Sequence, residues 1–267
     1  MRGKFIRRPN RFIAEVEIDG SIETVHVKNT GRLGEILKEG VTVYMEDFEG
    51  RMGSRKMRYS LVAAEKEVAP EIAQKIFAQP PADKEGVAIP ADNPTTPATA
   101  EVPSAPNTMT VNVDSQAPNK VVLEALREGR IRLEGLDELK LIRPETKYGD
   151  SRFDFYLEDV SGRRAFAEVK GVTLEFDGHA SFPDAPTERG ARHLRELMKA
   201  KAEGYLAYVI FVIQMKPMLD FSPNEEHDPV FSRALREADK SGVRIVAYDC
   251  KVTADSLVTD KQIKIVL

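Results

Sequence analysis

The clearest structural pattern in the second half of this chain lies in residues 151–172, SRFDFYLEDVSGRRAFAEVKGV. Two runs of alternating side chains flank Val160-Ser161-Gly162, which predicts a β-hairpin that turns at Ser161. In the register centred on Ser161, Asp154 faces Glu168. The opposite face then carries only apolar side chains, with Phe153, Phe155 and Leu157 opposite Val169, Ala167 and Ala165. A slip by one residue would bury the charges, so the hydrophobic pattern sets the register.

The polar face of this hairpin brings together Asp154, Glu168 and Lys170, because strand side chains alternate with period two. Two opposed carboxylates repel each other, and a divalent cation such as Mg²⁺ or Mn²⁺ would remove that repulsion. Lys170 would orient or deprotonate a water and neutralise charge on a phosphate. We therefore expect these three residues to be catalytic, with both acids as metal ligands and Glu124, on a preceding helix, as a further ligand. The alternative is a surface hairpin in which Lys170 neutralises one acid.

The segments around the hairpin predict a mixed α/β sheet. A helix with Asn119 as its N-cap, and with Val122, Leu123 and Leu126 on its buried face, precedes the sheet. The run Leu206 to Ile213 is apolar throughout, as in a central strand that is buried on both faces. Other helices are predicted over 188–202 and 229–240, and other strands over 140–147, 243–249 and 262–267.

A cationic stripe follows the helix predicted over 188–202, in which Arg189, Arg192, Arg195 and Lys199 are three or four residues apart. Such a stripe suits phosphate backbones, although it is also an ordinary polar helix face. We expect Thr187, Arg189, Arg192 and His193 to contact nucleic acid. In the loop before this helix, Asp184 or Thr187 is most simply the helix cap.

Residues 1–78 contain several short strands with a hairpin signal at Asp19-Gly20, which predicts a small all-β barrel. Basic residues cluster in two places, and Phe5, Phe12 and Tyr59 are interleaved with them, as in surfaces that stack single-stranded bases. The candidate nucleic-acid contacts of this part are Arg8, Arg11, Arg55, Lys56 and Arg58. A solvated, charged sheet edge is the alternative.

Residues 79–118 are predicted to be a flexible linker, because they hold eight of the sixteen prolines and no aromatic residue. The linker has one basic and five acidic residues, so it carries the whole formal charge of -4 and the two folded parts are neutral in sum. The single cysteine excludes an intrachain disulfide and a multi-cysteine zinc site. No apolar run is long enough to span a bilayer, so we expect a cytoplasmic protein without a membrane partner.

Several runs closely resemble the bacterial sugar fermentation stimulation protein A family: ETKYGDSRFDF (145–155), EVKGVTL (168–174), FPDAPTERGARHLREL (182–197), FSP (221–223) and KNTGRLG (28–34). The resemblance covers both folded parts in order. It implies an OB-like N-terminal barrel, a restriction-endonuclease-like PD-(D/E)xK domain over 119–267, and DNA binding. It also places Asp154, Glu168 and Lys170 at the nuclease positions, with Phe153 where the motif has proline. Asn29 and Thr30 match the family's barrel motif and are kept as contact residues.

The first hypothesis is a DNA-binding protein that hydrolyses phosphodiesters with Mg²⁺ or Mn²⁺. The second is a non-catalytic DNA-binding regulator, which the resemblance links to sugar utilisation. A partner in RNA processing is a third. The sequence leaves open single- or double-stranded DNA, and also whether the chain acts as a homodimer.

Overall fold

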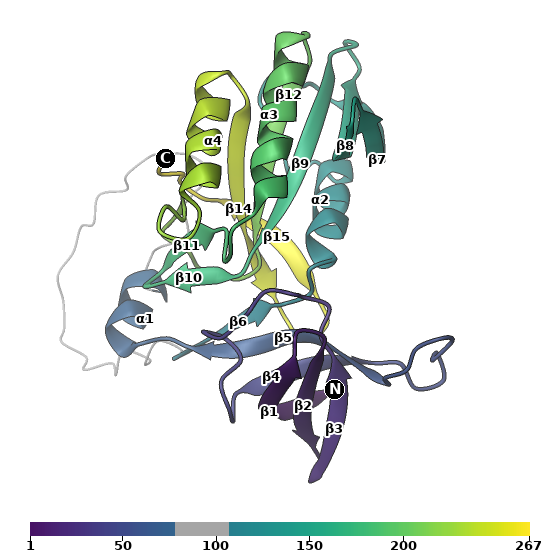
Figure 1. Ribbon diagram of the computed structural model, residues 1–267, viewed down its shortest axis with the longest axis vertical. Coiled ribbons are helices and arrows are strands. Elements are labelled where there is room, and N and C mark those ends of the chain that lie inside the picture. Colours follow the sequence, from purple (N-terminus) through teal and green to yellow (C-terminus); the bar gives the residue numbers. More distant parts are fainter. Residues whose placement is uncertain (78–106) are drawn as a thin grey trace, which may run out of the picture.

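The computed structural model describes residues 1–77 and 107–267, which form a β-barrel and an α/β unit stacked end to end (Figure 1). The barrel has five strands in the pairing order β3-β2-β1-β4-β5, and a parallel pairing of β3 with β5 closes it. Its strands are β1 (Arg2–Asn10), β2 (Ile13–Ile18), β3 (Ser21–His26), β4 (Thr42–Asp47) and β5 (Tyr59–Glu67). The predicted small barrel is confirmed.

The first strand of the barrel was not predicted, because the basic residues of β1 hide its alternation. Gly3 and Phe5 point inward, between exposed Arg2, Lys4 and Arg7. A Cβ on Gly3 would lie 2.6 Å from Val16 Cγ1, so the inward position at Gly3 has no room for a side chain. The basic cluster is therefore the outer face of a barrel strand.

The predicted linker is wrong at its C-terminal end. Residues 78–106 lie outside the described residues, but β6 (Thr108–Asn112) pairs antiparallel with β5 and extends the barrel sheet. Met109 and Val111 are buried there, and this short apolar alternation was masked by the polar residues around it. The helices α1 (Pro70–Phe77) and α2 (Ala117–Arg127) flank this segment. The N-cap of α2 is Gln116, so the predicted N-cap, Asn119, is wrong and lies inside the first turn.

The α/β unit is built on a six-stranded sheet in the order β15-β14-β12-β9-β8-β7, in which β9, β12 and β14 are parallel. Its strands are β7 (Leu139–Tyr148), β8 (Ser151–Asp159), β9 (Arg164–Val172), β12 (Leu206–Ile213), β14 (Arg244–Val252) and β15 (Leu257–Gln262). The predicted last strand over 262–267 is wrong, because β15 ends where that strand was placed to begin. A smaller sheet contains β10 (Leu174–Phe176), β11 (His179–Phe182) and β13 (Asp220–Pro223).

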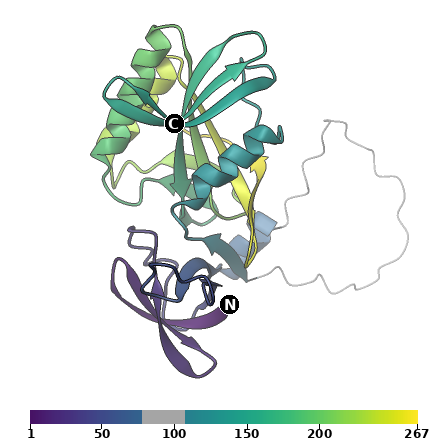
Figure 2. The same ribbon diagram turned by 90° about the vertical axis from the view of Figure 1, so that its right-hand side faces the viewer.

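Helices cover both faces of this sheet, as Figure 2 shows. The helices α3 (Glu188–Ala202) and α4 (Pro229–Lys240) pack on one face, and α2 packs on the other. The apolar residues of α3 recur at helical spacing, and its last turn carries Lys199 and Lys201, which complement the helix dipole. No helix within the described ranges is long and apolar enough to cross a membrane.

The register predicted for the hairpin of β8 and β9 is confirmed, with Phe155 opposite Ala167 and Leu157 opposite Ala165. One residue of the predicted apolar face is placed differently. Phe153 packs against Phe166, with ring centroids 5.2 Å apart, in the core on the α3 side of the sheet. The regular pairing of the two strands ends at Phe155, and beyond it the Asp154 side chain takes the place of a main-chain partner.

Candidate active site at the seam of the two units

The candidate site lies at the carboxyl ends of β9 and β12, which point toward the barrel (Figure 1). Ligands of open α/β sheets bind at this edge of the parallel strands. Gln214, directly after β12, ties this edge to the barrel sheet: its Nε2 donates to Asn112 Oδ1 over 2.8 Å, and Asn112 N donates to Gln214 O over 2.8 Å. The site is therefore held between the two units by buried hydrogen bonds.

Asp154 is half-buried on β8, and both of its carboxylate oxygens accept hydrogen bonds. Asn119 Nδ2 donates to Oδ1, and the Val169 main-chain N–H donates to Oδ2, each over 2.7 Å. Burial and the nearby Glu168 charge raise the pKa of Asp154, and the two hydrogen bonds only partly offset this. Ionised Asp154 is therefore held in a position where its charge is unfavourable without a further cation.

Glu168 is 3% exposed and lies between two donors. Its Oε1 accepts from Lys170 Nζ over 2.6 Å and from His193 Nδ1 over 2.5 Å. Burial alone would raise the pKa of Glu168, but the hydrogen bond from His193 and the charge of Lys170 outweigh burial and lower it. The second oxygen, Oε2, is buried and has no hydrogen-bond partner among residues 1–77 and 107–267. The predicted convergence of Asp154, Glu168 and Lys170 is thus present.

The orphaned Glu168 Oε2 fits a divalent cation, because a buried carboxylate oxygen without a partner costs free energy that a cation would recover. The predicted third acid does not join the pair. Glu124 is exposed on α2, and no group of three or more His, Cys, Asp or Glu side chains within residues 1–77 and 107–267 is arranged to hold a metal ion. The residue that α2 brings to Asp154 is Asn119 instead. The sequence singled Asn119 out only as a helix cap.

His193 was predicted to contact nucleic acid, and the structure corrects this. His193 is 3% exposed and lies on the buried side of α3, beneath the cationic stripe, where its Nδ1 donates to Glu168. Arg189 Nε lies 3.4 Å from His193 Nε2, which fits a ring that carries its proton on Nδ1. The signal was available in the sequence, because His193 falls on the buried stripe of Gly190, Leu194 and Leu197. Arg189, Arg192, Arg195 and Lys199 are exposed, as expected.

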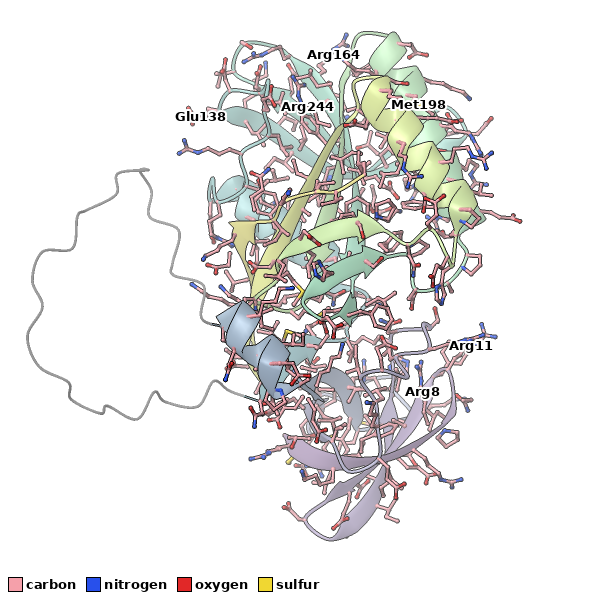
Figure 3. The ribbon with its side chains drawn as sticks, turned by 90° about the vertical axis from the view of Figure 1, so that its left-hand side faces the viewer. Arg8, Arg11, Glu138, Arg164, Met198 and Arg244 are labelled. Atoms are coloured by element: carbon pink, nitrogen blue, oxygen red, sulfur yellow. The ribbon has the colours of Figure 1, made fainter. Side chains whose placement is uncertain are left out.

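Arg8 was also predicted to contact nucleic acid, but its guanidinium is committed to main-chain carbonyls. Its Nη1 donates to Gly31 O over 2.6 Å and to Arg32 O over 2.9 Å, and its Nη2 donates to Asn29 O over 2.6 Å and to Arg11 O over 2.7 Å. Burial lowers the pKa of Arg8. Arg8 therefore shapes the Asn29-Thr30-Gly31 loop, whereas Arg11 is exposed; both lie near the junction of the two units (Figure 3).

The remaining basic side chains of the barrel differ in how far their charge is already paired within the protein. Arg58 pairs with both carboxylate oxygens of Asp47, at 2.8 and 2.7 Å, and with Glu49. Because these acids neutralise its charge, Arg58 is a poor contact for a phosphate. Arg55 stacks 3.6 Å from the Phe48 ring centroid and donates to Ser60 Oγ over 2.5 Å. Lys56 is exposed. Arg11, Arg55 and Lys56 stay predicted contacts.

Asn29 and Thr30 lie at a cavity of about 190 Å³ in the seam, which we call the seam cavity. It is lined by Asn29, Thr30, Gly31, Ser115, Gly171, Thr173, Leu174, Ser181, Phe182, Asp184 and Gln214. Gly171 directly follows Lys170, so the cavity adjoins the carboxylate pair along the chain. Thr187 lies nearby as the cap of α3, accepting from Gly190 N over 3.0 Å, which confirms the capping alternative.

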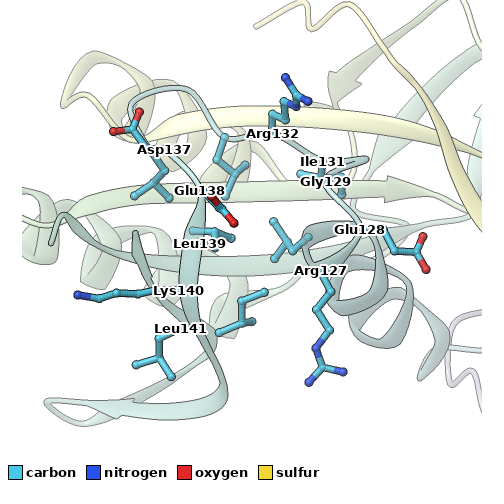
Figure 4. A pocket seen from close by; sticks show the side chains of 14 residues that line it. Arg127, Glu128, Gly129, Ile131, Arg132, Asp137, Glu138, Leu139, Lys140 and Leu141 are labelled. Atoms are coloured by element: carbon cyan, nitrogen blue, oxygen red, sulfur yellow. The ribbon is translucent and has the colours of Figure 1, made fainter. Parts of the chain in front are cut away.

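A larger cavity, of about 810 Å³, lies elsewhere, between the end of α2 and β7 (Figure 4). Its lining includes Leu133, Leu136 and Leu139 together with Arg127, Arg132 and Lys140. None of the predicted site residues lines it, so cavity size alone would have pointed away from the carboxylate pair.

Comparisons with known proteins agree across both units. A family model described as the sugar fermentation stimulation protein RE domain matches residues 116–256, and the SfsA N-terminal OB domain matches residues 6–72. A sugar fermentation stimulation protein homolog of Desulfitobacterium hafniense (strain Y51) is 45% identical, over 96% of this chain and 91% of that protein. A homolog of Clostridium beijerinckii is 43% identical, over 96% of this chain and 93% of that protein.

A solved structure extends this agreement to three dimensions. The structure of Pyrococcus furiosus SfsA in complex with Ca²⁺ superposes with a TM-score of 0.74 at 25% identity, covering 100% of this chain and 95% of that one. Its fold is therefore shared over both units, the barrel and the α/β unit. With two family models and relatives above 40% identity across its length, the chain belongs to the sugar fermentation stimulation protein (SfsA) family.

Proposed function

We propose that this protein binds DNA and hydrolyses its phosphodiester bonds with Mg²⁺ or Mn²⁺ at Asp154 and Glu168. The observation that carries the proposal is the buried, unpartnered Oε2 of Glu168 beside a second carboxylate whose pKa is raised. Both features are what an acid pair shaped around a divalent cation requires. The solved Pyrococcus furiosus relative is described in complex with Ca²⁺, a cation of the same oxygen-binding class.

Asp154 and Glu168 would hold the metal ion, which when bound would polarise a phosphoryl oxygen and lower the pKa of a water. Asn119 and the Val169 N–H fix the orientation of the Asp154 carboxylate. His193 fixes Glu168 in the same way, and it leaves Oε2 free. Lys170, with its ammonium 2.6 Å from Glu168, would neutralise charge that develops on the phosphate.

Binding to DNA is supported by the cations next to this site. Arg189 lies in the first turn of α3 and approaches His193, which connects the exposed stripe to the carboxylate pair. Arg192, Arg195 and Lys199 continue the stripe along the helix, although Lys199 is paired with Glu196 over 2.7 Å. Phosphate contacts of this kind make binding strongly dependent on salt.

One observation favours the second candidate function, a DNA-binding regulator without cleavage. Both oxygens of Asp154 and one oxygen of Glu168 already accept hydrogen bonds from the protein. In a protein of this fold that no longer binds metal, hydrogen bonds of this kind would stabilise the acidic side chains. The two candidates share the DNA-binding surface and differ only in whether the acid pair binds metal and cuts.

The deciding experiment is cleavage of labelled single- and double-stranded DNA with Mg²⁺, Mn²⁺ or EDTA. Asp154→Asn and Lys170→Ala are compared with wild type, and the exposed Asp239→Asn and Lys240→Ala, at the end of α4, are the matched controls. We expect metal-dependent cutting that the first pair abolishes and the controls retain. Salt-sensitive binding of DNA without any cutting, unchanged by Asp154→Asn, would support the regulator instead.

A further inference from the structure

The seam cavity is a preformed hollow whose lining does not include the acid pair. Both units contribute to its wall, the barrel through the Asn29-Thr30-Gly31 loop and the α/β unit through Thr173, Asp184 and Gln214. The barrel loop is held by Arg8, whose guanidinium binds the carbonyls of Asn29 and Gly31 over 2.6 Å each. The half-buried Arg8 guanidinium bonds to several loop carbonyls at once and so fixes the loop in one conformation.

The opposite rim is held just as firmly. Asp184 lies in the loop between β11 and α3, where Asn224 Nδ2 donates to Pro183 O over 3.1 Å and Thr187 N donates to Asp228 Oδ2 over 2.7 Å. The two rims meet closely, because a Cβ on Gly31 would overlap the Asp184 carboxylate. The cavity therefore has a defined shape before any ligand enters.

Some of the polar groups that line the cavity are engaged, because Ser115 Oγ donates to Lys28 O, Ser181 Oγ donates to Ser222 O and Gln214 Nε2 donates to Asn112. Others have no partner within residues 1–77 and 107–267. In the described part of the chain, no hydrogen bond or ion pair engages the side chains of Asp184, Thr30 or Thr173, and Gln214 Oε1 accepts from no donor. Asn29 uses only its Oδ1, which accepts from Gly31 N over 2.7 Å, so its amide N–H groups remain free. These groups offer both acceptors and donors to a ligand.

The volume of the seam cavity and the charge of its lining limit the class of ligand that it can hold. A volume of about 190 Å³ is below the roughly 300–1,000 Å³ of pockets for drug-sized molecules, so a single ring system fits better than a larger ligand. Asp184 is the one charged group of the lining, and it disfavours a phosphate. Phe182 adds an aromatic wall, and its ring is held by Phe231, with centroids 5.1 Å apart.

We propose that the seam cavity receives one unstacked nucleobase of a bound DNA strand and that Asp184 accepts a hydrogen bond from the exocyclic amino group of that base. This inference rests on the proposed function and adds a base preference to it. The neighbouring backbone then runs past Gly171 to Lys170, which places a phosphate near the acid pair. Enzymes that act on extruded bases read them in this way, by hydrogen bonds and an aromatic wall. Adenine, cytosine and guanine carry an exocyclic amino group and thymine does not.

The test is equilibrium binding of short fluorescent single strands in EDTA at one fixed low ionic strength, so that cleavage does not contribute. One strand is oligothymidylate, and the other is the same strand with one central cytosine. We expect wild type to bind the cytosine strand about tenfold more tightly, the effect of one hydrogen bond to a charged acceptor. Asp184→Asn keeps a neutral acceptor and loses the charge, so it should reduce that difference severalfold and keep the affinity for oligothymidylate. Asp239→Asn, which removes the same charge from exposed surface, should behave as wild type.

Three results would overturn the inference, and they are distinguishable. Equal affinity of wild type for both strands, or an unchanged preference in Asp184→Asn, would remove the base-reading role while leaving DNA binding intact. Competition by free ribose or glucose without a base preference would assign the cavity to a small sugar. Failure of wild type to bind either strand would instead contradict the proposed function, and this inference would fail with it.

Discussion

Replacing Asp154 by asparagine separates the metal hypothesis from a purely structural role. Asparagine keeps the shape of the side chain and one acceptor for the Val169 N–H, and Asn119 can turn its amide to accept from the new Nδ2. The variant also removes a buried charge that Glu168 disfavours. In EDTA we therefore expect Asp154→Asn to be as stable as wild type or more stable, by up to about 1 kcal/mol, the net value of one hydrogen bond.

Alanine at the same position gives the contrast. Asp154→Ala removes both 2.7 Å hydrogen bonds and leaves the Val169 N–H and the Asn119 amide without their acceptor. Each unsatisfied group costs about 1–3 kcal/mol, so we expect a loss of about 2–6 kcal/mol in the free energy of unfolding. The difference between the two variants reports the lost hydrogen bonds together with the lost packing of the side chain.

We expect a bound metal ion to raise the thermal stability of wild type and not that of Asp154→Asn. A cation at one hundred times its dissociation constant stabilises a protein by about 2.7 kcal/mol, which raises the Tm of a chain of this size by about 5–11 °C. The assay is thermal unfolding with Mn²⁺ or EDTA, with Glu124→Gln as a variant that should keep the full shift. A wild-type Tm indifferent to Mn²⁺, or an equal shift in Asp154→Asn, would refute the reasoning.

Three further outcomes are expected. His193→Ala should lower the free energy of unfolding by about 2–4 kcal/mol, because Glu168 loses a charged hydrogen bond and a buried ring leaves a cavity, whereas His193→Gln should recover part of it in urea denaturation. Arg8→Met should cost about 2–4 kcal/mol, since four carbonyls lose their donor, with exposed Arg11→Met as the control; equal stability of the two would contradict the loop role. Asp159 accepts from the Asp137, Ser161 and Arg163 main-chain N–H groups, and these bonds hold its pKa well below the usual range although burial opposes them. Its contribution is therefore present above the unfolded pKa of about 3.9 and is lost as pH falls through the lower folded pKa. Asp159→Asn should be less stable than wild type at neutral pH, with a gap that closes in acid; a gap independent of pH would contradict this.

The hairpin of β8 and β9 was predictable because its information is local. Period-two alternation and a turn at Val160-Ser161-Gly162 specify which residues oppose each other, and the structure has that register up to Phe155. The same holds for α3 and α4, whose apolar residues recur at helical spacing. The clustering of Asp154, Glu168 and Lys170 followed from these local rules.

The predictions that were wrong share a different cause, because each depended on contacts between segments that are distant in the sequence. His193 and Arg8 were assigned to the surface from residue type, but their partners are a carboxylate on another strand and four main-chain carbonyls, which no spacing rule reveals. The strand β6 was missed because its partner, β5, precedes it by about forty residues. Glu124 was chosen by charge, and the helix turned Asn119 toward the site instead.

The barrel, the mixed sheet and the acid pair with its lysine are predictable from the sequence, because each depends on periodic burial and on residues a few positions apart. The surroundings of that pair depend on tertiary packing. Packing of α3 on the sheet brings His193 to Glu168, and docking of the barrel on the carboxyl ends of β9 and β12 encloses the seam cavity. Contacts between distant segments depend on how whole elements pack, and side-chain pattern within one element carries no record of them.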